Sequence, residues 1–163
     1  MEDTVQLAVE LNEAAWVRFK RELADVTPDE ADWRPLPQAN SINLVLRHVR
    51  IDTAWHVAVL EDGIPQPPES LPLDFDRNLK ELDALYGRFI AALRATTLAA
   101  LREKTARAYG AAGPSLHRLG YHLALHLAGH GAQVRTIRNL YRTTRGEPAR
   151  FFPDNPTFPT GRP

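Results

Sequence analysis

Residues 115–147 read SLHRLGYHLALHLAGHGAQVRTIRNLYRTTRGE, and this proline-free stretch decides the fold. Apolar side chains recur in it at three- and four-residue steps, at Leu116, Leu119, Leu123, Leu127, Val134, Ile137 and Tyr141. That spacing places them on one face of an α-helix. Gly146 and Pro148 follow, and both residue types are typical of a helix C-terminus. We therefore predict a helix whose apolar face is turned toward a core.

The 13 prolines of the 163-residue chain leave three further long windows, 1–27, 38–64 and 73–113. Because proline stops a helix in its interior, each window predicts one helix. No stretch shows the sustained period-two alternation of a strand. The sequence thus predicts an all-α four-helix bundle, a single domain over residues 1–163. The expected helices span approximately 4–26, 41–61, 75–104 and 115–144. An irregular tail follows over 146–163; it is rich in Pro and Phe, and we expect it to pack on the bundle surface.

Composition excludes several classes of protein. Lys plus Arg number 20 and Asp plus Glu number 20, so the net charge is zero. Proteins that bind nucleic acids or membrane surfaces carry a basic excess, so we expect neither partner. The longest apolar run, Phe89–Leu93, is too short to cross a bilayer. The N-terminus is acidic and lacks the basic and then apolar segments of a signal peptide. We expect a cytoplasmic protein. With no cysteine, its chemistry must come from histidines, carboxylates, hydroxyls or a bound cofactor.

The window 38–64 differs from the others because it carries two apolar faces. One holds Ile42, Val45, Leu46, Val49 and Leu60, and the other holds Leu44, Ile51, Trp55 and Val59. A helix that is apolar most of the way round is buried on both sides. The second face must then meet a long loop, the tail or another subunit, so a homodimer is expected.

Three of the six histidines, His122, His126 and His130, follow each other at four-residue steps in the predicted helix 115–144. Each step advances about 400°, so the three rings share one face. A pair at i and i+4 can hold one metal ion through its imidazole nitrogens. A third ligand must come from another helix, and His48, set among apolar residues of the second window, is the best candidate. His122 remains an alternative to His126.

Two polar residues near these histidines are candidates for the chemistry. Asp52 follows His48 by four residues and can accept a hydrogen bond from metal-bound water, act as a base or pair with an arginine. Gln133 follows His130 by three residues and can orient a ligand or a substrate. No glutamate directly follows His126, so the zinc-peptidase pattern is excluded.

Further residues lie near the histidines in the sequence. Arg135 is near enough along the helix to meet an anionic substrate. Gly129 and Gly131 flank His130, and two glycines in a helix interior suggest a packing or functional reason, because each costs about 1 kcal/mol relative to alanine. No partner can be identified for His56 or His117.

The chain resembles the DinB-like (damage-inducible) four-helix bundle superfamily over roughly residues 5–145. The first motif of this superfamily resembles three segments of the chain, Trp33-Arg34-Pro35, Asn40-Ser41-Ile42 and Leu46-Arg47-His48. The run His122-x3-His126-x3-His130-Gly131-Ala132-Gln133-Val134-Arg135 resembles the second motif, a series of histidines that ends in His-x-Gly-Gln-like residues. Two departures stand out: Ala132 intervenes between Gly131 and Gln133, and Asp52 stands where the family often has glutamate.

The resemblance implies one divalent metal ion, zinc or nickel, held by His48, His126 and His130. Characterised relatives include transferases and isomerases that use low-molecular-weight thiols, and many others have no known reaction. A metal on three imidazoles keeps its charge and an open position, so it can activate water or a thiol. Without cysteine, any thiol would arrive as a cosubstrate.

The leading hypothesis is therefore a metal-dependent thiol transferase or hydrolase that acts on a small electrophilic substrate, with Asp52 and Gln133 as catalytic residues. The alternative is a non-catalytic, stress-associated metal-binding or dimeric helical module.

Overall fold

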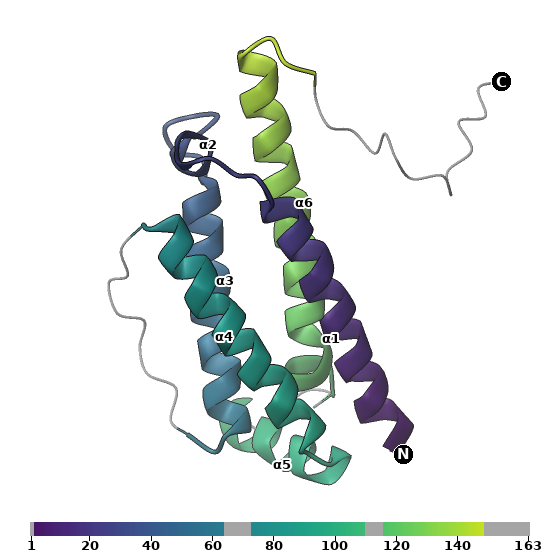
Figure 1. Ribbon diagram of the computed structural model, residues 1–163. Helices are drawn as coiled ribbons and strands as arrows, with labels where there is room; N and C mark the ends of the chain where they lie inside the picture. Colours follow the sequence, from purple (N-terminus) through teal and green to yellow (C-terminus); the bar gives the residue numbers. More distant parts are fainter. Residues whose placement is uncertain (1, 64–72, 110–115, 149–163) are drawn as a thin grey trace, which may run out of the picture.

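The computed structural model describes residues 2–63, 73–109 and 116–148, and these residues form helices and loops with no strand (Figure 1). In chain order the helices are α1 (Glu2–Leu23), α2 (Pro28–Asp32), α3 (Ile42–Leu60), α4 (Phe75–Arg94), α5 (Leu98–Tyr109), the π-helix η1 (Leu116–Tyr121) and α6 (His122–Thr144). The predicted all-α fold is confirmed. Ser41 and Asp74 cap α3 and α4: their side-chain oxygens accept hydrogen bonds from the backbone N–H of Leu44 and Arg77.

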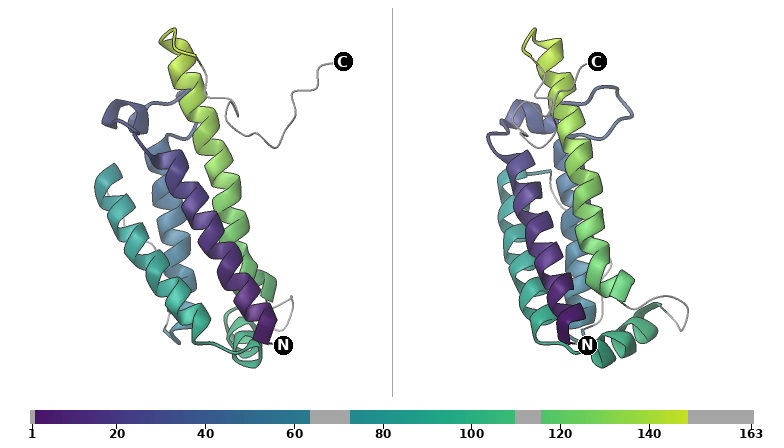
Figure 2. Two further views of the ribbon diagram at one scale, coloured as in Figure 1. Left: turned by 45° about the vertical axis from the view of Figure 1, so that its right-hand side comes forward. Right: turned by 90° about the vertical axis from the view of Figure 1, so that its right-hand side faces the viewer.

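Four long helices, α1, α3, α4 and α6, form the bundle (Figures 1 and 2). α1 and α3 each contact both α4 and α6. In Figure 1, α1 and α6 run upward while α3 and α4 run downward. The neighbours α3 and α6 are therefore antiparallel, and this orientation determines which of their side chains meet.

The core lies between these helices and consists mainly of leucine and aromatic side chains. The largest fully buried ones include Phe19, Leu46, Leu82, Tyr86, Phe89, Leu123 and Leu127. Trp16 stacks on Tyr86 with 4.7 Å between ring centroids. Each such burial contributes about 1.5–3 kcal/mol, so the apolar stripes seen in the sequence hold the bundle together.

The helix expected over 75–104 is interrupted, and α4 and α5 replace it. The chain leaves α4 after Arg94, and the hydroxyl of Thr97 accepts a hydrogen bond from the backbone N–H of Ala100 at 3.2 Å, which caps α5. α5 lies across one end of the bundle, where it contacts α3 and η1 (Figure 1).

The loop between the first two predicted helices contains the short helix α2. Thr27 caps it and Pro28 occupies its first turn. Glu30 is buried and forms an ion pair with Arg138 of α6 at 2.8 Å. Arg138 also donates to two backbone carbonyls at the end of α1, at 2.8 and 2.7 Å. This buried network ties α2 to α1 and α6.

The expected start of the last helix is a π-helix instead of an α-helix. In η1 the carbonyl of Gly120 accepts a hydrogen bond from the side-chain amide of Asn12 at 2.6 Å. Tyr86 in turn donates to the side-chain oxygen of Asn12 at 3.1 Å. A π-helical turn widens the helix and redirects the side chains on it.

The two faces expected on α3 differ in their burial. The first face is buried throughout, at Ile42, Val45, Leu46, Val49 and Leu60. On the second face Val59 is buried, whereas Leu44, Ile51 and Trp55 are only half-buried. The predicted tail over 146–163 lies almost wholly outside the described residues. Among the described helices, none combines the length and the apolar character that crossing a membrane requires.

Candidate metal centre

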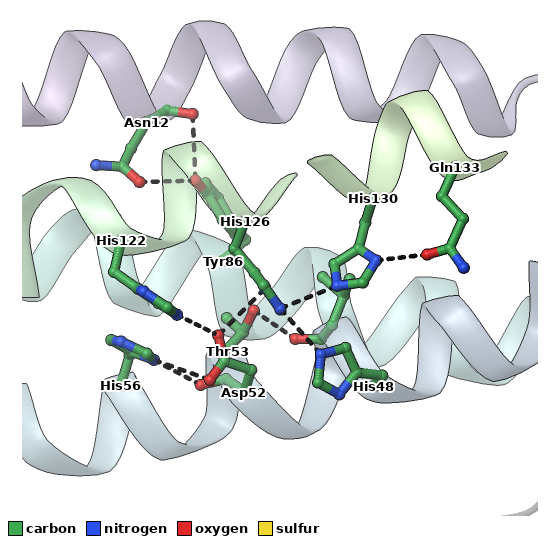
Figure 3. Close-up of polar contacts among 11 residues, drawn as sticks. Asn12, His48, Asp52, Thr53, His56, Tyr86, His122, His126, His130 and Gln133 are labelled. Carbon is green, nitrogen blue, oxygen red and sulfur yellow. Dashed lines mark hydrogen bonds and ion pairs between the residues drawn. The ribbon is translucent and has the colours of Figure 1, made fainter. Parts of the chain in front are cut away.

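Two rows of polar side chains meet between α3 and α6 (Figure 3). α3 carries His48, Asp52 and His56, and α6 carries His122, His126 and His130, each row at four-residue steps. Because the helices are antiparallel, the rows pair in reverse order. The pairs are His56 with His122, Asp52 with His126, and His48 with His130. Ring centroids are 5.0 Å apart in the first pair and 4.9 Å in the last, and Asp52 Oδ2 lies 3.2 Å from His126 Nδ1.

The Nε2 atoms of three histidines converge at one end of these rows. Nε2 of His126 lies 2.9 Å from Nε2 of His48 and 3.0 Å from Nε2 of His130. One ligand nitrogen from each ring lies within 4.8 Å of the other two. The structure thus brings His48, His126 and His130 together, and we call them the three-histidine cluster.

Two acceptors lie near the Nδ1 atoms of this cluster. Nδ1 of His130 lies 2.9 Å from the side-chain oxygen of Gln133, and this contact favours a proton on that Nδ1. Nδ1 of His126 lies 3.2 Å from the Asp52 carboxylate as an ion-pair contact and forms no hydrogen bond among the described residues. With its Nδ1 protonated, His130 presents the lone pair of Nε2 toward Nε2 of His126, 3.0 Å away. Three imidazole nitrogens that converge in this way fit a metal ion.

Burial keeps two of these rings neutral near pH 7. It lowers the pKa of His126 to about 4, although the nearby Asp52 charge opposes the shift. Burial and the neighbouring His130 also lower the pKa of His48 below its usual value. A neutral imidazole is the form that binds a metal, so the cluster is ready to bind one at neutral pH.

A second group, Asp52, His56 and His122, also has ligand atoms within 4.8 Å of one another. Its histidine on α3 is committed elsewhere: Nδ1 of His56 donates to the backbone carbonyl of Asp52 at 2.8 Å, and the His56 ring also bonds the backbone of Arg118. A protonated Nδ1 offers no lone pair to a metal. His122 lies in this group, with its Nε2 3.4 Å from Asp52 Oδ2.

Several expectations for single residues need correction. His48 is exposed rather than embedded among apolar side chains. Arg135 is not directed at a substrate, because both carboxylate oxygens of Glu22 accept from its Nε at 3.1 Å. A Cβ at Gly129 would meet open space among the described residues. At Gly131 it would make ordinary contacts, the nearest with Phe19 at 3.6 Å, so space does not require either glycine.

Two histidines had no partner in the sequence analysis. The side chain of His117 lies outside the described residues. His56 is almost fully buried, and its ring stacks on His122. The signal that identifies His56 is its spacing, since His48, Asp52 and His56 repeat the four-residue step of the histidines on α6.

A comparison with known protein families matches residues 11–134 to the DinB superfamily. Neither the curated proteins nor the solved structures gave a match. The matched region contains both rows of polar side chains and the whole three-histidine cluster.

Proposed function

The chain belongs to the DinB superfamily, and from this premise we propose that it is a metal-dependent enzyme with its ion on His48, His126 and His130. The observation that supports the proposal is the convergence of three Nε2 atoms: that of His126 lies 2.9 Å from that of His48 and 3.0 Å from that of His130. Three imidazoles from two helices that aim ring nitrogens at one point form the donor set of a metal site.

The ion we propose is zinc or nickel. Nitrogens bound at about 2.1 Å lie roughly 3.0 Å apart on adjacent corners of an octahedron and roughly 3.4 Å apart in a tetrahedron. The 2.9 and 3.0 Å separations between Nε2 atoms lie near both spacings, so the cluster can hold either ion.

The reaction we propose is transfer of a low-molecular-weight thiol to a small electrophile, or hydrolysis of that electrophile. The ion, when bound, supplies Lewis acidity that lowers the pKa of a thiol or of water to about 7. The side-chain oxygen of Gln133 lies 2.9 Å from Nδ1 of His130, which favours the tautomer whose Nε2 lone pair faces the cluster. The carboxylate of Asp52, 3.2 Å from Nδ1 of His126, places a negative charge beside the site and offsets part of the ion's charge.

A cytoplasmic homodimer accompanies this proposal. Apolar side chains exposed on the outer faces of α1 and α6 support self-association, among them Leu7, Leu11, Leu125 and Leu140. Light scattering coupled to size-exclusion chromatography tests the dimer: a mass of one chain at micromolar concentration would contradict it.

The metal is tested first. The chain is purified without a polyhistidine tag, and its bound metals are measured by plasma mass spectrometry. We expect one zinc or nickel ion per chain, and no ion in a folded His126→Ala, His130→Ala double variant. His122→Ala is the matched control, because it removes a histidine from the same face of α6 and should keep the metal.

The same variants test the chemistry. A wild-type chain that stays metal-free after incubation with both ions contradicts the metal site. Loss of the ion in His122→Ala alone contradicts the ligand set. An unchanged rate in a metal-free His126→Ala variant, on a substrate that the wild type converts, contradicts the enzymatic role.

A further inference from the structure

A pocket of about 380 Å³ lies against the three-histidine cluster, between α3 and the start of α6. Its lining includes Ile51, Asp52, Trp55, Arg118 and His122, and it reaches the three-histidine cluster at His48. A molecule of modest size in this pocket would place one end at the cluster.

The apolar wall of the pocket comes from the same face of α3 as the cluster. His48, Ile51, Asp52 and Trp55 follow at i, i+3, i+4 and i+7, so they lie in one row along the helix. Ile51 and Trp55 are half-buried, as the wall of an open pocket would be. Ile51 and Trp55 of the second apolar face of α3 therefore have a role within the chain.

The opposite wall carries a positive charge. Arg118 lies in the π-helix η1, its backbone is bonded by the buried ring of His56, and its side chain is exposed and lines the pocket. Among the described lining residues the only carboxylate is Asp52, and it faces the imidazoles of His122 and His126. The pocket thus combines a guanidinium, an apolar wall and a cation-binding cluster.

We propose that this pocket binds a small carboxylate, with Arg118 as the residue that selects it. The planar guanidinium pairs with the two carboxylate oxygens, the apolar part of the molecule packs on Ile51 and Trp55, and its other end lies at the three-histidine cluster. This inference rests on the proposed function, because it names the substrate class of that same site.

The test uses two compounds that differ only in charge, 3-phenylpropanoate and 3-phenylpropanamide. Their dissociation constants are measured by ligand-observed NMR on the full chain, both metal-free and zinc-loaded. We expect the carboxylate to bind at least about tenfold more tightly than the amide in both forms, because a charge-assisted pair exceeds a neutral hydrogen bond by that factor.

Variants assign the preference to the pocket. Arg118→Gln should abolish it and leave amide binding unchanged, while Arg118→Lys should retain part of it. Arg102→Gln removes an equally exposed arginine from α5 and should change nothing. Trp55→Ala should weaken the binding of both compounds equally.

Four results would overturn the inference: no binding of either compound at millimolar concentration, equal binding of both, a preference that survives Arg118→Gln, or a preference that is equally lost in Arg102→Gln. A preference seen only in the zinc-loaded form that survives Arg118→Gln would mean that the carboxylate sits on the metal. None of these results bears on metal content, which is measured separately, so failure of the pocket and failure of the metal site are distinguishable.

Discussion

Replacing Asp52 by asparagine is expected to weaken metal binding at the three-histidine cluster by about ten- to a hundredfold. Oδ2 of Asp52 lies 3.2 Å from Nδ1 of His126, the ring whose Nε2 faces both other ligands. Asparagine has the same shape, so packing between α3 and α6 is preserved. Only the negative charge that supports the His126 ring is lost.

The magnitude follows from the distance across the ring. An ion on Nε2 of His126 lies roughly 6 Å from the Asp52 carboxylate. At an effective dielectric constant of about 20, that separation gives about 3 kcal/mol per unit of ionic charge. The Asp52 side chain keeps 24% of its surface exposed, so solvent screens part of this attraction. A loss of roughly 1.4–2.7 kcal/mol corresponds to the stated range.

Competition with a chromophoric chelator at pH 7 measures the effect for zinc and nickel. Asp83→Asn is the matched control, because it removes an exposed carboxylate that pairs with Lys20 at 3.2 Å on the bundle surface. That variant should bind within about twofold of the wild type. The reasoning is refuted if Asp52→Asn also stays within threefold of the wild type, or if both variants weaken equally.

Three further outcomes are expected. In the metal-free protein, the free energy of unfolding should fall as the pH drops from 6.5 toward 4, by roughly 1–2 kcal/mol at pH 5. Burial lowers the pKa of His126 to about 4 and also lowers the pKa of His48 and His56, so the unfolded chain takes up these protons first; urea unfolding at both pH values should show the loss, and His126→Gln should show a smaller one. Gln133→Glu should tighten metal binding, because it strengthens the acceptor 2.9 Å from His130 Nδ1. Gln133→Leu removes that acceptor and should weaken metal binding about tenfold. The opposite order of affinities in chelator competition would contradict this role of Gln133. Glu30→Ala should destabilise the fold by about 3–5 kcal/mol in urea unfolding, since it leaves Arg138 buried without its charge partner, and a loss below 1 kcal/mol would be inconsistent with that network.

The sequence predicted the helices where prolines separate them and apolar residues recur at helical spacing. The break between α4 and α5 was missed because no proline marks it, although Thr97 is a residue typical of a helix cap. The short helix α2 had a clearer signal, since Thr27-Pro28-Asp29-Glu30 combines a capping residue, a proline in the first turn and an acid at the third position. The sequence did not predict the π-helical turn, in which the Gly120 carbonyl accepts a hydrogen bond from Asn12, a residue far away in the sequence.

The sequence predicted that His48 would meet histidines of the last helix, and its spacing alone left His122 as an alternative to His126. The four-residue steps place each row on one helix face. Only the antiparallel packing of α3 and α6, and the register within it, decides that His48 meets His126 and His130 while His56 meets His122. Arg135 was misassigned for a related reason: Glu22, its ion-pair partner, lies 113 positions away.

Gln133 and Asp52 approach the three-histidine cluster from two different helices. Gln133 lies three residues after His130, and residues at i and i+3 are neighbours on a helix surface. Its amide oxygen therefore reaches Nδ1 of His130 at 2.9 Å, a hydrogen-bond distance. Asp52 lies on the facing helix α3 and places its carboxylate 3.2 Å from Nδ1 of His126. The charged group should matter more for metal affinity and the neutral one for ring orientation.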